Sequence, residues 1–166
     1  MLVPFDESFV TERYRRWMHS PDVTQYLESR HVLPSLDDLR AYVERMTASP
    51  DVYFFAVVNR ETREHLGNLK LGPVDSFHLR SPIGVVVGEP SAWGRGIATE
   101  AIGAVSDWAF NVLGLYKLAA GSYSNNIGSI RAFQKAGFRI EGELAGNVVL
   151  ADGSRGDAVV LGRTAE

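Results

Sequence analysis

The residues best suited to chemistry in this chain begin with a pair of glycines. The segment Trp93-Gly94-Arg95-Gly96-Ile97-Ala98-Thr99 lies between an apolar strand pattern and a long helical pattern. A turn of this kind leaves several backbone N–H groups unpaired at the N-terminus of the helix, where the helix dipole adds partial positive charge. Glycine also lets a ligand approach the main chain without a Cβ in the way. The segment therefore predicts a binding site for phosphate or pyrophosphate.

The two commonest phosphate-binding motifs do not fit this turn. A dinucleotide fingerprint would need a third glycine where Thr99 stands, and an acidic residue closing the following strand. An ATP-binding loop would need Gly-Lys-Ser/Thr, which the sequence does not contain. The prediction of a phosphate site therefore remains, but it belongs to neither of these two families.

Composition bounds the function further. A length of 166 residues fits one domain, expected to span 1–166, and a net charge of −3 favours neither nucleic acid nor a membrane surface. The chain has no cysteine, which excludes disulfides, thiol catalysis and Cys-based metal sites. The four histidines lack metal-ligand spacing, so no metal is expected. Without a signal-peptide pattern or a membrane-length apolar run, the protein is predicted to be cytoplasmic.

The elements before the glycine turn are two helices and three strands. Apolar spacing predicts a helix over 8–18, and Ser35 with Asp38 forms a capping-box signature for a second helix. Residues 23–30 show no clear period and are predicted to form a short helical turn and a loop. Strands are then predicted, in a three-stranded antiparallel meander, at 52–58, 65–71 and 83–88.

After the turn, the pattern indicates a parallel crossover. Apolar positions from Ile97 to Val112 follow helical spacing, and a strand is predicted over 116–123, so this strand should run parallel to 83–88. Asn126 is predicted to cap a last helix that ends before Gly137, and 138–150 with 157–161 is predicted to close the fold as a hairpin.

Two motifs in this order resemble the GNAT superfamily of acetyl-CoA-dependent N-acetyltransferases. Trp93-Gly-Arg-Gly-Ile-Ala98 resembles the pyrophosphate loop of that family, and Asn126-Ile-Gly-Ser129 followed by Lys135-Ala-Gly-Phe138 resembles its second signature. The segment from Trp93 to Ala101 is most similar to acetyltransferases of ribosomal-protein N-termini and of nucleotide-linked amino sugars. The resemblance implies an α/β (α+β) fold with a mixed, mostly antiparallel sheet of six to seven strands flanked by four helices.

The resemblance also implies how acetyl-CoA, as co-substrate, would bind. The pantetheine arm would lie along the central strand, and the pyrophosphate on the turn, where Trp93 replaces the usual Arg or Gln. Asn126 would contact the arm, and Phe133 stands where many members have a Tyr general acid. The residues assigned to the cofactor are Val85, Val86, Val87, Gly94, Arg95, Gly96, Ile97, Ala98, Thr99, Asn126 and Phe133.

The resemblance identifies the catalytic residues less closely than the cofactor-binding residues. Because phenylalanine cannot donate a proton, Ser129 is predicted to be the general acid, with Tyr123 behind it. Glu89 and His78 are the candidate general bases, and water relayed to bulk solvent is an alternative to both.

The acceptor is predicted to be a primary amine, on a nucleotide-linked amino sugar or a peptide N-terminus. It would bind among the first helices, the loops 19–35 and 72–82 and the final hairpin, where Arg30, His31, His78 and Arg80 favour a phosphate-bearing acceptor. A strongly acidic groove would instead favour a cationic peptide or polyamine. A homodimer through the last strands is compatible with the family. The alternatives are a non-catalytic acyl-CoA-binding regulatory module and a structural protein whose glycine turn is only tight packing.

Overall fold

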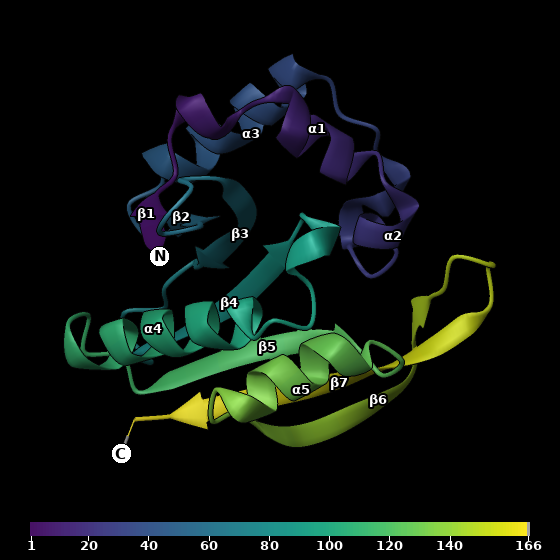
Figure 1. Ribbon diagram of the computed structural model, residues 1–166. Coiled ribbons are helices and arrows are strands. Elements are labelled where there is room, and N and C mark those ends of the chain that lie inside the picture. The colour runs from purple at the N-terminus through teal and green to yellow at the C-terminus, as the bar shows by residue number, and fades with distance from the viewer. Residues whose placement is uncertain (166) are drawn as a thin grey trace.

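A computed structural model describes residues 1–165 as seven strands, five α-helices and three short 3-10 helices (Figure 1). The strands are β1 (Leu2–Pro4), β2 (Tyr53–Val58), β3 (His65–Leu71), β4 (Arg80–Val87), β5 (Lys117–Tyr123), β6 (Arg139–Val149) and β7 (Arg155–Thr164). The α-helices are α1 (Glu12–Met18), α2 (Pro21–Thr24), α3 (Leu36–Ala48), α4 (Ile97–Asn111) and α5 (Ile127–Lys135). The 3-10 helices are η1 (Glu7–Phe9), η2 (Glu28–His31) and η3 (Pro90–Ala92).

All seven strands form one sheet in the order β1-β2-β3-β4-β5-β7-β6. Every neighbouring pair is antiparallel except β4 and β5, which are parallel and joined by the crossover through α4. The predicted meander, parallel crossover and closing hairpin are therefore confirmed. The sheet is mixed and mostly antiparallel, as predicted.

The sheet separates two hydrophobic cores. α1 to α3 cover one face, where Phe54, Ala56 and Val58 of β2 pack under Trp17 and Leu39 (Figure 1). α4 and α5 cover the other face, where Leu69, Leu71 and Leu118 are fully buried with Ile102 and Phe133. Alternation along each strand thus sends successive side chains into different cores, which leaves both faces of the central strands covered.

The caps predicted from single residues are present. The Ser35 hydroxyl accepts from the Asp38 amide at 3.1 Å, and the Asp38 carboxylate accepts from the Ser35 amide at 2.9 Å, which completes the capping box. The Asn126 side chain accepts from the Ser129 amide at 3.2 Å and caps α5. Gly137 lies at φ +89°, the left-handed conformation expected after a helix end.

The first third of the chain differs most from its prediction. The helix expected over 8–18 is divided, because Thr11 caps α1 and the preceding turn is the separate 3-10 helix η1. Pro21 does end the first helix, and it also occupies the first turn of α2, where its missing N–H costs nothing. β1 was not predicted. Its three residues carry no alternation long enough to detect, and it forms by pairing with β2.

β4 and β5 separate soon after they meet, and this separation shapes the functional site. Their pairing covers only Arg80 to Pro82 against Lys117 to Ala119, so the rest of β4 has β3 on one side and no strand on the other. The structure places the start of β4 at Arg80, three residues before the predicted start, because these three residues form the contact with β5.

Residues 1–165 include no helix both long and apolar enough to cross a bilayer. Over the same residues, His, Asp and Glu side chains form no group of three or more that could hold a metal ion.

Candidate active site

A single cavity of about 1210 Å³ passes through the opening between β4 and β5. On one side of the sheet it is lined by residues that we call the α4–α5 chamber: Val87, Trp93, Gly94, Gly96, Ile97, Ala98, Thr99, Asn126, Ser129 and Phe133. On the other side it is lined by the α1–α3 chamber: Tyr14, Met18, Asp22, Tyr26, Glu28, Asp38, Leu39, Tyr42, Phe54, Asn68, Lys70 and Gly84. The cavity thus joins the glycine turn to the space beneath the first three helices.

The glycine turn has the geometry of an anion site. Gly94 and Gly96 lie at φ +72° and +81°, and a Cβ at either position would meet nothing within 4 Å. Gly96 is the N-cap of the 15-residue helix α4 and offers no side-chain cap. Within residues 1–165, the amides from Gly94 to Thr99 have no acceptor. A row of unpaired N–H groups therefore meets the positive end of the helix dipole.

Trp93 secures this turn to the end of the preceding strand. Its indole Nε1 donates to the carbonyl oxygen of Val87 at 2.7 Å, while the side chain stays partly exposed and lines the cavity. The residue that replaces the usual Arg or Gln thus contributes a hydrogen bond that the sequence did not indicate.

The main chain of β4 offers unpaired groups to the opening. Gly88 donates to Leu66, and Pro82 accepts from Gly72, so the even-numbered residues face β3. Alternation then turns the N–H and C=O groups of Val85 and Val87 toward the opening, where no strand of residues 1–165 pairs with them. Of these groups, the Val87 C=O already accepts from Trp93, which leaves the Val85 N–H and C=O and the Val87 N–H for a ligand. Val86 differs from its neighbours: its main-chain groups face β3, and its side chain packs on the α1–α3 face.

Asn126, Ser129 and Phe133 all line the cavity from α5. The Ser129 hydroxyl makes no hydrogen bond within residues 1–165, so it can donate or accept toward the cavity. Phe133 is 2% exposed and packs edge-on against Phe138 at 5.1 Å between ring centroids. The structure thus brings together the predicted general acid and the predicted cofactor residues, with two exceptions: Arg95 is not among the lining residues, and Val86 contributes only its side chain.

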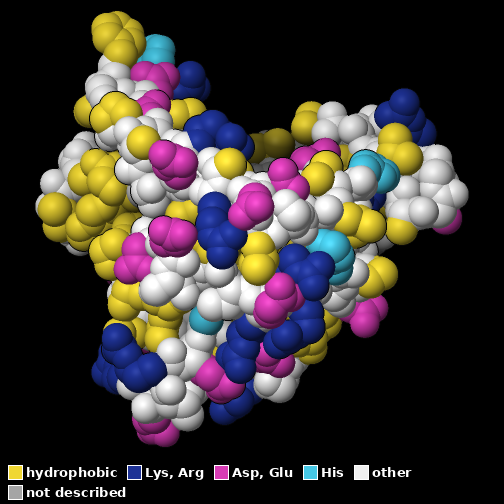
Figure 2. All heavy atoms as spheres, turned by 90° about the horizontal axis from the view of Figure 1, so that it is seen from above, with side chains coloured by type: hydrophobic (Ala, Val, Ile, Leu, Met, Phe, Trp, Pro, Cys, Tyr) yellow, Lys and Arg dark blue, Asp and Glu magenta, His cyan; other side chains and the backbone are white. Residues whose placement is uncertain are grey.

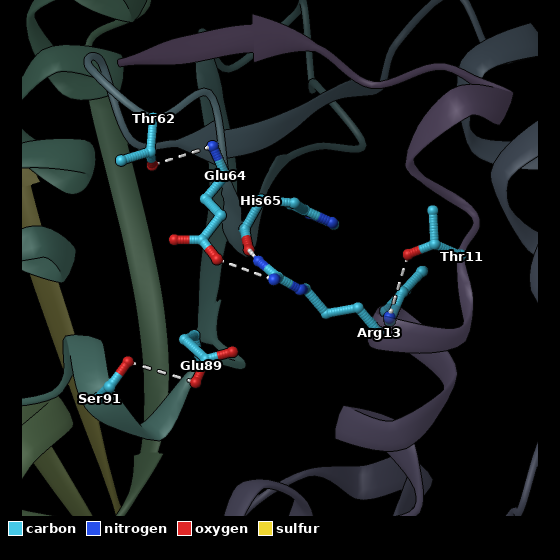
Figure 3. Close-up of polar contacts among 8 residues, drawn as sticks. Thr11, Arg13, Thr62, Glu64, His65, Glu89 and Ser91 are labelled. Atoms are coloured by element: carbon cyan, nitrogen blue, oxygen red, sulfur yellow. Dashed lines mark hydrogen bonds and ion pairs between the residues drawn. The ribbon is translucent and has the colours of Figure 1, made fainter.

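The two candidate bases lie outside this cavity. Glu89 follows β4, and its carboxylate accepts from Ser91 at 3.3 Å (Figure 3). Glu89 is not among the residues that line the cavity. His78 lies in the 72–79 loop, where its amide donates to Asp75 at 2.9 Å. No residue of the predicted 72–82 acceptor loop lines the cavity, because that loop lies at the opposite end of β4 from the glycine turn.

The basic residues expected to favour a phosphate-bearing acceptor are placed elsewhere. Arg30 donates to the Tyr123 hydroxyl at 2.6 Å and to the Val149 carbonyl oxygen, and its guanidinium lies 5.7 Å from the Tyr123 ring centroid. Arg80 pairs with Asp75 at 3.2 Å outside the cavity. Arg30 therefore ties η2 to β5 and to the closing hairpin, whose tip rises beside α2 (Figure 1).

Acidic groups mark the α1–α3 chamber. Asp22, Glu28 and Asp38 line it from α2, η2 and α3, and Glu28 accepts from the Tyr123 hydroxyl at 3.1 Å. The Ser35 hydroxyl and amide donate to Asp38 and lower the pKa of its carboxyl, so it is ionised at neutral pH. Viewed from above α1 to α3, the outline of the molecule is notched, and both acidic and basic side chains lie around the notch (Figure 2).

Behind the chamber, β3 carries a buried polar group. His65 is 8% exposed among Phe5, Phe9 and Trp17, and its Nε2 lies 2.8 Å from Asn68 Oδ1 and 3.1 Å from the Gly67 carbonyl oxygen. A carbonyl oxygen can only accept, so the proton lies on Nε2. Burial lowers the pKa of His65, so the ring is neutral. His65 and the Arg13–Glu64 ion pair appear in Figure 3.

Known proteins share this sequence pattern and this architecture. The family model described as an acetyltransferase (GNAT) domain matches residues 1–139. The alpha/beta-tubulin-N-acetyltransferase 9 of Homo sapiens is 31% identical over 149 residues, covering 83% of this chain and 71% of that protein. The spermidine N(1)-acetyltransferase of Escherichia coli K12 is 35% identical over 81 residues, or 49% of this chain and 43% of that protein.

The fold is also that of a solved structure. The spermidine N-acetyltransferase from Vibrio cholerae, in complex with CoA and spermine, superposes with a TM-score of 0.87 over 99% of this chain and 94% of that one. The sequence identity is 18%, so the likeness is one of fold.

Proposed function

This chain belongs to the GNAT family of acetyltransferases, which take their acetyl group from acetyl-CoA, and on that premise we propose that it acetylates a cationic primary amine held in the α1–α3 chamber. The observation that carries the proposal is the single cavity, which joins an anion-binding turn to an acidic chamber through the opening between β4 and β5.

The residues of the α4–α5 chamber fit acetyl-CoA. The unpaired amides from Gly94 to Thr99 would hold the pyrophosphate, and the outward N–H and C=O of Val85 with the N–H of Val87 would pair with the pantetheine arm. Asn126 would add a side-chain contact to the arm. An N–H group of β4 near the thioester would stabilise the carbonyl oxygen as charge develops on it.

Direct transfer in a ternary complex requires a balanced exchange of protons. The amine nitrogen attacks the thioester carbonyl carbon, the carbon–sulfur bond breaks, the nitrogen loses a proton and the sulfur gains one. Ser129 is the proposed donor to the sulfur, because its hydroxyl lines the cavity without a protein partner. With Glu89 and His78 outside the cavity, water leading to bulk solvent is the proposed route for the proton from the amine.

The acidic side chains of the α1–α3 chamber favour an acceptor that arrives as an ammonium ion. Asp22, Glu28 and Asp38 would attract it and hold it before it loses its proton. A peptide N-terminus and a polyamine both have this chemistry. The relatives and fold neighbours named above include an enzyme named for tubulin, a protein, and enzymes named for spermidine, a polyamine.

A nucleotide-linked amino sugar is a second candidate acceptor. Tyr14, Tyr26 and Tyr42 line the α1–α3 chamber and offer aromatic faces with polar tips. Such side chains suit a sugar ring, which presents both apolar and hydroxyl groups.

The test is thiol release from acetyl-CoA across three acceptor classes: peptides with unblocked N-termini, polyamines, and 4-amino-sugar nucleotides. Turnover with a peptide or a polyamine supports the proposal, and turnover confined to the sugar nucleotides selects the second candidate. Tight CoA binding without turnover on any of them would instead identify a non-catalytic acyl-CoA-binding module. An N-terminally blocked version of the best peptide is the matched control, because it retains every contact except the reacting amine.

A further inference from the structure

Lys70 enters the α1–α3 chamber from the middle of the sheet. It lies on β3 opposite Phe54 of β2 and Gly84 of β4. Phe54 belongs to the core beneath α1 and α3, and residues directly opposite each other project from the same face of a sheet. The Lys70 side chain therefore emerges beneath these helices, where the half-buried residue lines the chamber.

This ammonium group has no partner in the described part of the chain. No carboxylate there lies within 4 Å of it, although Arg13, Arg40, Arg80, Lys117 and Arg163 all form ion pairs. The other basic residues lining the cavity, Arg131 and Lys135, belong to α5 on the far side of the sheet. An ammonium group that lines a cavity without a counter-ion attracts anions, and an anionic group on a ligand would pair with it.

The structure leaves room for such an anion beside Lys70. Its β4 neighbour is Gly84, and a methyl group built at Gly84 would meet no atom within 4 Å. Phe54, Tyr42 and Leu39 form the nearby apolar wall, with Phe54 and Tyr42 in edge-on contact at 5.8 Å. Apolar walls lower the local dielectric constant and strengthen the attraction between an ammonium group and an anion.

We propose that Lys70 and the open space over Gly84 form an anion subsite, so that the acceptor carries a carboxylate or phosphate close to its reacting amine. The inference rests on the proposed function. Gly84 lies two residues after Pro82, where β4 leaves β5, so the subsite adjoins the opening through which the two chambers meet. Asp22 and Glu28 would receive the ammonium end of the same acceptor, which makes the preferred substrate zwitterionic.

The first experiment detects anion binding at Lys70 directly and does not depend on turnover. Lys70, Lys117 and Lys135 are the three lysines of the chain, so 13C-lysine labelling gives a side-chain spectrum that single Lys→Arg variants can assign. CoA is kept at a saturating concentration so that the glycine turn is occupied. Sodium phosphate or sodium acetate is then added, and sodium chloride is reduced to keep the ionic strength constant. We expect the Lys70 Cε–Hε signal to shift saturably with one of the two anions, and which of them acts distinguishes phosphate from carboxylate. A Lys70 shift no larger than that of Lys117, which is paired with Glu141, overturns the subsite.

The second experiment measures substrate preference. Primary amines are compared in matched pairs: a carboxylate against its carboxamide, and a phosphate monoester against its alcohol. Lys70→Met is expected to raise KM about 10-fold or more for the anionic member and less than about twofold for its neutral partner, as loss of a charged hydrogen bond predicts. Lys70→Arg should retain the preference, and Arg60→Met in the exposed β2–β3 turn controls for net charge.

Either result separates this inference from the function on which it rests. Equal KM changes for both members of a pair would overturn the anion subsite and leave acetyl transfer intact. Anion binding at Lys70 without turnover on any amine would support the subsite and count against the enzyme function.

Discussion

The indole N–H of Trp93 donates to the carbonyl oxygen of Val87 at 2.7 Å, across the turn that separates β4 from α4. This bond fixes the turn against the strand whose main chain faces the opening. It also satisfies one of the few main-chain acceptors that β5 leaves unpaired. The turn is thereby held in place before any ligand arrives, which reduces the ordering required on binding.

Trp93→Phe should therefore weaken acetyl-CoA binding while preserving the fold. The variant keeps the aromatic ring and loses the bond to Val87, so KM for acetyl-CoA should rise about 2- to 10-fold, the range expected for one neutral hydrogen bond. Steady-state kinetics at saturating acceptor measures the change. Trp108→Phe, in the aromatic contact with Tyr53 and Phe55, is the matched control and should leave this KM unchanged. Equal KM values for wild type and Trp93→Phe would contradict a role for the bond.

Gly96→Ala and Gly103→Ala should have opposite effects on stability. Gly96 lies at φ +81°, where an L-residue costs about 1–2 kcal/mol, so the melting temperature should fall by about 2–8 °C. Gly103 lies inside α4 with nothing within 4 Å of an added Cβ, so alanine there should raise the melting temperature by about 1–4 °C. Differential scanning calorimetry compares the two.

The same pair separates binding from stability. The Gly96→Ala methyl group would enter the anion site, and KM for acetyl-CoA should rise about 10- to 100-fold, whereas Gly103→Ala should leave it unchanged. An unchanged KM in Gly96→Ala would show that the turn does not receive the pyrophosphate.

Ser129→Ala should lower kcat with little change in KM for acetyl-CoA. A placed general acid contributes about 10²- to 10⁴-fold in rate, so a loss of about 100-fold is expected if Ser129 supplies the proton. The cap of α5 remains, because Asn126 bonds to the backbone amide of residue 129 and not to its hydroxyl. A kcat equal to that of the wild type would show that Ser129 is not the general acid. Tyr123 would then be the candidate, and Tyr123→Phe the next variant to measure.

Acid should destabilise the fold through His65. Burial lowers the folded-state pKa of His65 below its ordinary value of about 6.5, so the native state favours the neutral ring. The stability from this group is complete above about pH 6.5 and is lost as pH falls toward the folded-state pKa, because the unfolded chain binds the proton more readily. Urea unfolding at pH 7.5 and 5.5 should show a larger decrease in unfolding free energy for the wild type than for His65→Gln. Equal decreases would assign the acid sensitivity to other groups.

Local signals in the sequence were enough to predict the elements with strong caps and long periods. Ser35 with Asp38 and Asn126 are caps whose partners lie three residues away, so their geometry depends on the adjacent chain alone. The fold around the glycine turn followed from the same kind of information, because Gly94 and Gly96 adopt backbone conformations that few other residues tolerate.

Features that depend on distant segments were missed. Arg30 meets Tyr123 and Val149 across 93 and 119 residues, so its position in a loop gave no sign that its guanidinium is engaged within the chain. The position of Lys70 under α1 and α3 required the register of β2 and β4 on either side. Glu89 is a candidate base by its place after β4, but whether its carboxylate reaches the cavity depends on the whole fold, and it lies outside.

The short contact between β4 and β5 has a mechanical consequence. Within residues 1–165, only three residue pairs of β4 and β5 connect the four-stranded half of the sheet to the three-stranded half by strand pairing. The pantetheine arm of acetyl-CoA, lying extended against Val85 and Val87, would connect the two halves where strand pairing is absent. Acetyl-CoA binding is therefore expected to slow hydrogen exchange at the amides of Val85 and Val87. With this co-substrate bound, the two halves of the sheet would open as one cooperative unit.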